Sequence, residues 1–303
     1  MGAISIIPVR THRPAGPSED AAMALLRIGW TLLVLALAAG CAAEGESLER
    51  LRREGVIRIG YAVEAPYAFL SPQGRVTGEA PEVARAVVER LGIGRVEWRQ
   101  AEFSRLLDEL DEGRVDMLAA GMFITPERAA RVLFSEPTFH VRQALLVPRG
   151  NPLDLHSYGQ AAAKGARMAV LGGSVEERLL RELYASPERL IVVPDAVTGL
   201  VAVESGQADG LALSSPTVRW MSGQDQLGRT ETAEPFEQEP GIADRLGFGA
   251  FVFRKSFPAL RAACNAELAR FIGSPEHRAL VAPFGFTESE LPGGVRTSQI
   301  LER

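Results

Sequence analysis

Arg128 stands in a stretch where a strand end, a turn and a helix start are expected to follow one another. Residues 115–120 form a short apolar run, Thr125 suits an N-cap, and Pro126 suits the first helical position. Such a helix start points unpaired backbone N–H groups and the positive end of the helix dipole at whatever lies in front of it. With the Arg128 guanidinium beside them, these groups could bind a carboxylate. Arg128 could instead be a solvated helix charge, because nearly every basic residue of this chain is an arginine.

A second helix start of similar character is expected at Ser174. Gly172 and Gly173 precede it, and Ser174 with Glu177 three residues later has the pattern of a capping box. By itself this pattern predicts only that a helix begins here, whereas the glycines would also let a ligand approach backbone N–H groups. The segment lacks the Gly-x-Ser-x-Gly of a nucleophile elbow, because Glu176 stands in the last position, and it lacks the Gly-Lys-Ser/Thr of a phosphate-binding loop.

Length and composition indicate a globular chain with room for two compact lobes. The 303 residues are 46% hydrophobic and 23% charged, which excludes a disordered or collagen-like protein. The net charge is −5 and no run of basic residues offers a surface for a phosphate backbone. We therefore expect no nucleic-acid partner.

Residues 1–41 are expected to lie outside the fold. A short basic start at Arg27 leads into an apolar stretch, 28–38, that is too short to span a bilayer comfortably, and small residues then precede Cys41. This arrangement resembles a bacterial lipoprotein signal, in which Cys41 is acylated and becomes the first residue of the mature protein. Ordinary cleavage after a small residue is the alternative, because Ala38 occupies the position three before the cysteine.

The remaining cysteine and the histidines predict no metal chemistry. Cys264 lies in a helical pattern and is expected to be a buried, inert thiol without a disulfide partner if Cys41 is acylated. The four histidines are scattered, and no Cys/His cluster has the spacing of metal ligands. We expect neither a metal site nor a cofactor.

Strands and helices alternate along both halves of the chain, which predicts an α/β protein with a mainly parallel sheet in each lobe. Two crossovers are expected between the lobes, so that strand ends and helix starts of both lobes face a shared cleft. The predicted divisions are 1–41 for the signal and acylation site, 42–50 for a tether, 51–147 for the first part of lobe 1, 148–245 for lobe 2, and 246–303 for the return segment of lobe 1.

Several segments together resemble the family 3 extracytoplasmic solute-binding proteins of polar amino-acid-type ABC importers. The resemblance implies a periplasmic-binding-protein type II architecture that closes on a ligand between its lobes. It also implies a non-catalytic role, with an ABC permease and its ATPase as partners. The segments that carry the resemblance, in the order of the family, are 51–60, 113–122, 124–128, 134–137 and 205–209.

Within that family, the sequence is most similar to the ectoine and hydroxyectoine binders. The likeness lies in Glu64-Ala65-Pro66-Tyr67 followed by the segment 78–85, and an Asp that usually holds the ligand ammonium is missing near Leu213. The helix caps Thr125 and Ser174 are expected to add donors from the two lobes, with Ser214 and Ser215 as further second-lobe candidates. By the resemblance, the pocket is formed by Glu64, Tyr67, Phe103, Phe123 and Arg128.

The chemistry of such a ligand suits these residues. Ectoine is a zwitterion with a carboxylate and a cyclic amidinium, so Arg128 would take the carboxylate and Glu64 would accept from the ring N–H groups. The three aromatic residues would form a box around the delocalised cation, although any one of them could be a core residue. Phe123 is expected to face the ligand rather than the core.

The expected function is capture of a compatible solute outside the cytoplasmic membrane by a lipid-anchored monomer, and delivery to an ABC importer. A polar amino acid is the alternative ligand. A dehydratase acting on cyclic acids is the alternative from another class, with Glu64 as the candidate base. That reaction needs an acid and a base within reach of one substrate atom, and only one carboxylate is apparent in the expected pocket.

Overall fold

The computed structural model describes residues 48–240 and 246–302, which belong to one compact unit. The expected signal, Cys41, most of the tether and the expected lobe boundary at residue 245 lie outside the described residues. Residues 48–54 are helical and lead into the first strand. Within the described ranges, no helix is both long enough and apolar enough to cross a membrane.

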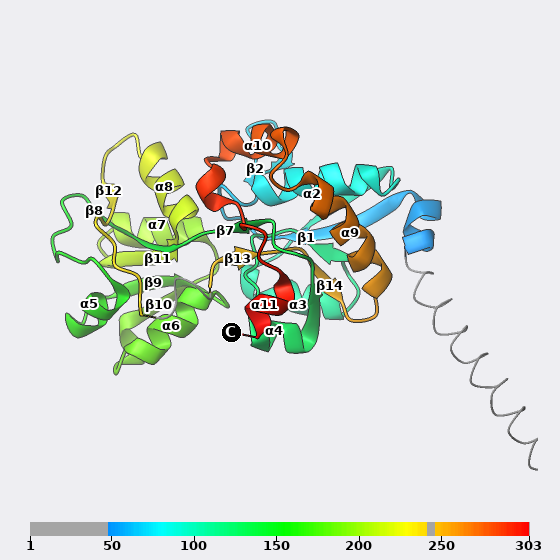
Figure 1. Cartoon of the computed structure of the whole chain (residues 1–303). Helices are drawn as coiled ribbons and strands as arrows, with labels where there is room; N and C mark the ends of the chain where they lie inside the picture. The colour runs from blue at the N-terminus through cyan, green and yellow to red at the C-terminus, as the bar shows by residue number, and fades with distance from the viewer. Residues whose placement is uncertain (1–47, 241–245, 303) are drawn as a thin grey trace, which may run out of the picture. The chain divides into compact units, whose positions relative to one another are not determined.

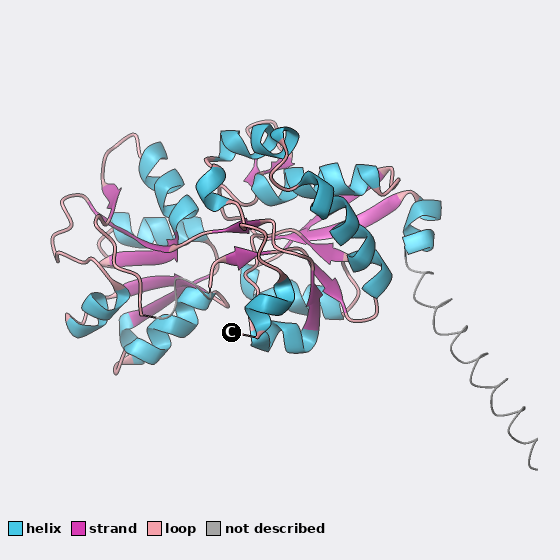
Figure 2. Ribbon diagram, in the orientation of Figure 1, coloured by secondary structure: helices cyan, strands magenta, loops and turns pink. Residues whose placement is uncertain are grey.

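Two five-stranded sheets organise the described part of the chain (Figure 1). The first has the strand order β4-β1-β5-β14-β6 and the second has the order β10-β9-β11-β8-β12. The first three strands of each order pair in parallel, and the remaining pairs are antiparallel. Helices cover both sheets, as Figure 2 shows. The expected type II architecture of two α/β lobes is confirmed.

The first lobe combines the N-terminal half of the chain with its C-terminal end. β14 enters the first sheet between β5 and β6, although it lies far later in the sequence. Helices α2 and α9 contact each other, and their apolar residues Val83, Val87, Leu260 and Cys264 belong to one buried cluster. Cys264 is a buried free thiol, as expected. The elements of this lobe are β1 (Val56–Tyr61), β2 (Phe69–Leu70), β3 (Val76–Thr77), α2 (Glu79–Arg90), β4 (Arg95–Gln100), η1 (Phe103–Arg105), α3 (Leu106–Asp111), β5 (Met117–Leu118), α4 (Pro126–Arg131), β6 (Val132–Phe134), β14 (Val252–Arg254), α9 (Pro258–Phe271), α10 (Pro275–Val281), η3 (Ala282–Phe284), η4 (Glu288–Glu290) and α11 (Thr297–Leu301).

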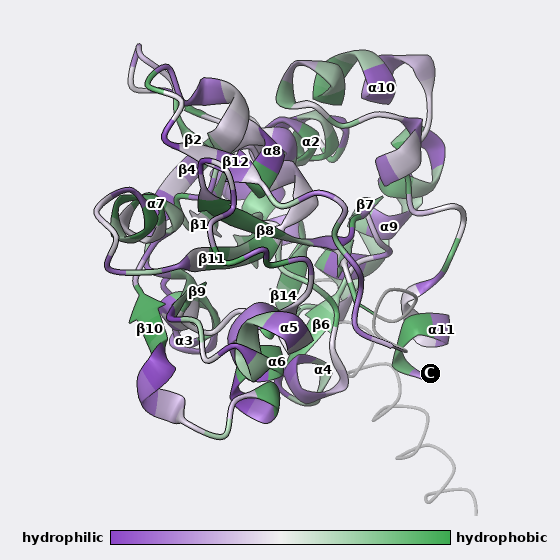
Figure 3. Cartoon of the chain, turned by 90° about the vertical axis from the view of Figure 1, so that its left-hand side faces the viewer, coloured by the Kyte–Doolittle hydropathy of each residue, from purple (hydrophilic) through white to green (hydrophobic). Residues whose placement is uncertain are grey.

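The second lobe has the more deeply buried sheet. Every residue of β9 and β11 is buried, which explains why these strands are continuous apolar runs rather than alternating patterns. Figure 3 shows the same hydrophobic character along β8 and α7. The elements of this lobe are β8 (Gln143–Pro148), α5 (Tyr158–Ala163), β9 (Met168–Leu171), α6 (Val175–Leu183), η2 (Pro187–Arg189), β10 (Leu190–Val193), α7 (Ala196–Glu204), β11 (Gly210–Ser214), α8 (Ser215–Gln224) and β12 (Thr230–Thr232).

The structure differs from the expected divisions at β8. The sequence placed this apolar run at the end of lobe 1, whereas β8 pairs with β11 and β12 in the second sheet. The chain therefore passes to the second sheet before β8 and not after it. An apolar run indicates that a strand is buried, but it does not indicate which sheet the strand joins. The pattern alone therefore could not assign β8 to the second lobe.

Two neighbouring strands connect the lobes. β7 (Phe139–His140) and β13 (Phe248–Gly249) form an antiparallel pair between the two sheets (Figure 1). The His140 ring stacks on the Phe248 ring with 4.0 Å between the ring centroids. The expected pair of crossovers is thus confirmed as two strands that support each other.

Candidate ligand-binding site

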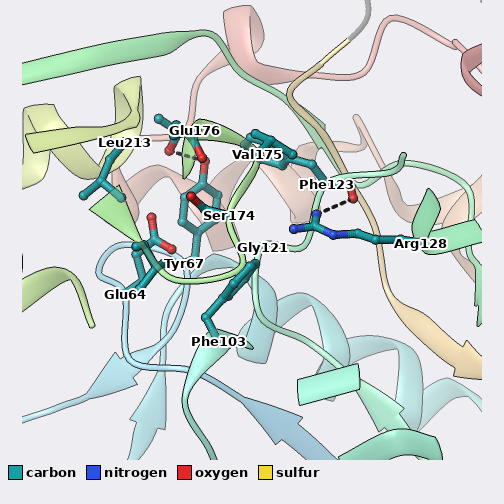
Figure 4. A pocket seen from close by; sticks show the side chains of 12 residues that line it. Glu64, Tyr67, Phe103, Gly121, Phe123, Arg128, Ser174, Val175, Glu176 and Leu213 are labelled. Carbon is teal, nitrogen blue, oxygen red and sulfur yellow. Dashed lines mark hydrogen bonds between the residues drawn. The ribbon is translucent and has the colours of Figure 1, made fainter. Parts of the chain in front are cut away.

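A pocket between the two lobes gathers six of the seven residues that the sequence proposed for ligand binding. It contains about 320 Å³ of empty space when its opening to solvent is counted, but the enclosed cavity is only about 20 Å³, so the pocket is nearly closed in this structure. Figure 4 shows the side chains around it. Its walls are strand ends, helix starts and the loop after β1, as the cleft of such a fold requires. The lining residues are Glu64, Tyr67, Phe103, Gly121, Phe123, Arg128, Leu171, Ser174, Val175, Glu176, Leu213 and Ser214.

Thr125 is the proposed residue that does not line this pocket. Its hydroxyl accepts a hydrogen bond from the Arg128 backbone N–H at 3.3 Å, and Pro126 occupies the first turn of α4, so the predicted cap is confirmed. Thr125 instead lines a groove between the starts of α4 and α6. The structure gives it the role of orienting the helix that carries Arg128.

Glu64 reaches from the first lobe to the second. It lies in the loop after β1, where its backbone forms a bridge with Ala68, and only 8% of the residue is exposed. The Thr217 hydroxyl of α8 donates to Glu64 Oε1 at 2.7 Å. Burial raises the pKa of Glu64 to about 7, and the charge of Glu176 adds to the rise while Thr217 opposes it.

Tyr67 also crosses between the lobes. Its hydroxyl lies 2.9 Å from the Ser214 hydroxyl, and both residues are buried. Its ring packs against Phe139 and Phe286, with centroid distances of 5.0 and 5.6 Å. Burial holds the pKa of the phenol well above its usual value, so Tyr67 offers a neutral O–H and a ring face.

Arg128 is held in place by backbone carbonyls of both lobes. Nη1 donates to the Phe123 carbonyl and Nη2 donates to the Gly173 carbonyl of the second lobe, each at 2.8 Å. The guanidinium carbon lies 5.6 Å from the centroid of the Phe103 ring, a cation–π contact. Burial lowers the pKa of Arg128 to about 10, and the nearby Glu176 charge partly offsets this effect. The side chain stays charged at neutral pH, and a guanidinium has five N–H donors, of which two are used here.

Phe123 lines the pocket and packs into the core at the same time. Its ring makes an edge contact with Phe139 at a centroid distance of 6.2 Å, and it belongs to the large hydrophobic cluster of the first lobe. It is 6% exposed. The sequence predicts that Phe123 faces the ligand rather than the core. In the structure the residue does both, because it lines the pocket and belongs to the buried cluster.

The helix start at Ser174 is built differently from the expected capping box. Ser174 accepts from the Glu177 backbone N–H at 3.0 Å, as predicted, but the Glu177 carboxylate accepts from Gly173 N–H at 2.7 Å. The N–H of Ser174 itself is taken by the Leu171 carbonyl at 3.1 Å. The Gly172 N–H is bonded to the Val193 carbonyl, so the glycine N–H groups that were expected to be open to a ligand are occupied.

Sequence reasoning missed Glu176 and Thr217. Glu176 is the second residue of α6, lines the pocket and is 4% exposed. Burial raises its pKa to about 7, while its own backbone N–H, the Arg128 charge and the Ser174 hydroxyl oppose the rise. An acidic residue two positions after the cap, in the first turn of the helix, is the signal that could have found it. Ser214, a candidate from the sequence, does line the pocket, whereas Ser215 lies in a separate groove near His140.

The described residues therefore bring one guanidinium and two carboxyl groups to the pocket, among aromatic and hydroxyl side chains. No group of three or more His, Cys, Asp or Glu residues that could hold a metal ion occurs in residues 48–240 and 246–302. Such a site is suited to bind a small molecule that has a carboxylate at one end and cationic N–H groups at the other.

Comparison with known proteins places this geometry in context. Residues 57–287 match the model of the bacterial extracellular solute-binding proteins, family 3. A probable amino-acid ABC transporter periplasmic-binding protein of Sinorhizobium fredii is 33% identical over 277 residues, which cover 90% of this chain and 88% of that protein. The crystal structure of EhuB in complex with hydroxyectoine is similar with a TM-score of 0.77 and 32% identity, over 85% of this chain and 98% of that one. An ancestral amino acid-binding protein, a precursor of cyclohexadienyl dehydratase, shares the fold with a TM-score of 0.68 at 22% identity, over 78% of this chain and 99% of that one.

Proposed function

The chain belongs to family 3 of the bacterial extracellular solute-binding proteins, and we propose that it captures the zwitterionic compatible solutes ectoine or hydroxyectoine. In this role it delivers the solute to an ABC permease and its ATPase. Acylation of Cys41 would keep the protein, as a monomer, at the outer face of the cytoplasmic membrane.

One observation carries the proposal: a guanidinium and a buried carboxyl group line a single small pocket together with three aromatic rings. Arg128 has N–H groups to spare for the ligand carboxylate, and Glu64 can accept from the ring N–H groups. A delocalised cation against an aromatic face gains roughly 0.5–2 kcal/mol when water is excluded. Tyr67, Phe103 and Phe123 supply such faces here.

The likeness to EhuB supports the choice of ligand. That protein was crystallised with hydroxyectoine, and its 32% identity extends over 98% of its own length. The Glu64–Tyr67 loop and the start of α2, which carry the resemblance in sequence, are also joined in the structure, because Glu79 N–H bonds to the Pro66 carbonyl at 3.0 Å. A correctly placed loop after β1 is what positions both Glu64 and Tyr67.

Calorimetry tests the proposal directly. The purified protein is titrated with ectoine, hydroxyectoine, glycine betaine and a set of common amino acids at pH 7.5. We expect tight binding of ectoine or hydroxyectoine, and binding of glycine betaine that is weaker by tenfold or more, because its quaternary ammonium has no N–H to offer Glu64. Tight binding of an amino acid with none of ectoine would refute the proposed ligand.

Two other candidate functions can be tested with the same purified protein. A polar amino acid is favoured by the name of the Sinorhizobium fredii relative, an amino-acid transporter component. A dehydratase is favoured by the second buried carboxyl group, Glu176, which supplies the acid or base that the sequence did not reveal. Incubation with prephenate and arogenate, followed by chromatography, would reveal turnover if the pocket were catalytic.

A further inference from the structure

Two carboxyl groups meet at the ligand pocket from different lobes. Glu64 comes from the loop after β1 and Glu176 from the first turn of α6, and both line the same small pocket. Each is buried, and the charge of Glu176 adds to the rise that burial causes in the pKa of Glu64. Two ionised carboxylates in one small, poorly hydrated pocket repel each other, so their titrations are coupled.

The charges around the pair leave room for one proton. Among the described residues that line the pocket, Arg128 is the single cation, so with both acids ionised this lining would have a net charge of −1. Burial raises the pKa of the Tyr67 and Tyr158 phenols, and the charge of Glu176 adds to this rise. Both phenols are therefore neutral. Further charged groups of the described residues do not change this balance. Glu127 and Arg178 form an ion pair with 2.7 Å between Oε1 and Nη1, and burial raises the pKa of Glu79, whose charge acts on Tyr67, to about 8.

We infer that Glu64 and Glu176 share one proton in the empty pocket and release it to solvent when a cationic nitrogen of the ligand binds between them. This inference rests on the proposed function, since it concerns the ligand of the same site. The carboxylates then accept N–H hydrogen bonds from the ligand, and the ligand carboxylate pairs with Arg128. Glu176 becomes the second-lobe contact for the cationic side of the ligand, which the sequence did not supply.

Proton release makes ligand affinity depend on pH. Because a bound cation stabilises the ionised carboxylates, it lowers their affinity for the proton, and by linkage a proton lowers the affinity for the ligand. Affinity should therefore fall as pH falls through the neutral range. Release of one proton weakens binding by up to about tenfold per pH unit, so binding should be at least tenfold weaker at pH 5.5 than at pH 7.5.

Calorimetry in buffers of different ionisation enthalpy counts the protons. The full chain is titrated with ectoine at pH 7 in phosphate and in Tris, and L-arginine is used as a probe with one more positive charge. We expect release of about one proton per ectoine and more with arginine if it binds. Glu176→Gln should release much less, because Glu64 alone ionises more readily once its acidic neighbour is gone. Glu182→Gln, an exposed residue of the same helix, should behave as the wild type.

A titration without ligand separates this inference from the proposed function. Potentiometry of the wild type, Glu176→Gln and Glu64→Gln between pH 5.5 and 8.5 should show fewer protons bound by either variant near pH 7. If no solute in the panel binds, the proposed function fails, but this titration still decides whether the pair holds a proton. Wild-type curves that match both variants, or an ectoine enthalpy that is the same in both buffers, would overturn the inference.

Discussion

At the scale of single residues, the pocket holds the charged Arg128 side chain although burial disfavours its charged form. Arg128 tolerates this because two backbone carbonyls and the Phe103 ring surround the guanidinium. One of these carbonyls, that of Gly173, belongs to the other lobe. The same side chain is thus placed to bind a ligand carboxylate and to hold the lobes together.

Arg128→Ala should weaken binding of the best ligand by about 2 kcal/mol, roughly thirtyfold, because it removes charge-assisted hydrogen bonds to the carboxylate. Calorimetry at pH 7.5 measures the change. Arg131→Ala is the matched control: it lies on the same helix, but it pairs with Asp108 and Asp111 at the surface. Equal affinities for wild type and Arg128→Ala would show that the carboxylate binds elsewhere.

Glu79 is a second residue whose burial has a measurable consequence. It is 1% exposed, and neither carboxylate oxygen has a hydrogen-bond partner of normal geometry. Burial raises its pKa to about 8; the Thr138 hydroxyl is close enough to oppose this rise in part, although not placed for a regular bond. The folded protein therefore holds a proton on Glu79 that the unfolded chain loses near pH 4.5.

The sign of the effect on stability follows from this difference. Between about pH 4.5 and pH 8 the folded state binds more protons than the unfolded state, so the contribution of Glu79 falls as pH rises and levels off above pH 8. Glu79→Gln, which is neutral at every pH, should be more stable than the wild type at pH 8.5, by on the order of 1 kcal/mol or more. Thermal unfolding from pH 5 to 8.5 measures this; Glu89→Gln, exposed on the same helix, should follow the wild-type curve.

At the scale of elements, helix starts place much of the site. Caps are local features, which is why Thr125 and Ser174 could be predicted from the sequence and found in the structure. The two caps differ in what they position: Thr125 orients the helix of Arg128, and Ser174 begins the turn that carries Glu176. A cap substitution should therefore affect both stability and binding only where the turn lines the pocket.

Ser174→Ala tests this expectation. Loss of its bond to Glu177 N–H should lower the free energy of unfolding by about 1 kcal/mol. Affinity should also fall, because the turn that carries Glu176 loses its anchor. Asp195→Ala removes a similar cap, from Thr198 N–H at 2.8 Å, on a helix start that does not line the pocket. It should cost similar stability and leave affinity unchanged, and a loss of affinity in both variants would mean that binding merely follows stability.

Some features that depend on distant partners could not be predicted from the sequence. β8 reads as an apolar strand, but only its pairing with β11 and β12 assigns it to the second sheet. No element was predicted from the sequence at the start of α8, Ser215-Pro216-Thr217, so the bond from Thr217 to Glu64 was missed. The resemblance found Glu64 and Tyr67, yet the acid opposite them, Glu176, comes from a helix turn whose direction is set by the other lobe.

At the scale of the whole described chain, direct contacts between the lobes define a closed arrangement. Tyr67 bonds to Ser214, Glu64 to Thr217, and Arg128 to Gly173, each from the first lobe to the second. We propose that β7 and β13 are the hinge about which the lobes open to admit the ligand. An opening motion would break all of these bonds together while leaving the core of each lobe intact.

Gly173→Ala should disfavour this closed arrangement much more than it disturbs either lobe. A Cβ at Gly173 would lie 2.9 Å from Ser104 Cα, a backbone atom of the opposite lobe that cannot yield easily. The population of closed protein should fall, and the apparent affinity should drop by about tenfold or more, since affinity scales with the competent fraction.

Gly206→Ala separates this effect from backbone strain. Its φ of +72° is close to the +78° of Gly173, but a Cβ there meets nothing within 4 Å. Both variants should lose about 1 kcal/mol of stability from the left-handed conformation. Only Gly173→Ala should lose affinity. In small-angle scattering with saturating ligand, only this variant should keep the larger radius of gyration of an open form. If the liganded Gly173→Ala protein were as compact as Gly206→Ala, contact of Ser104 with Gly173 would not be what limits closure.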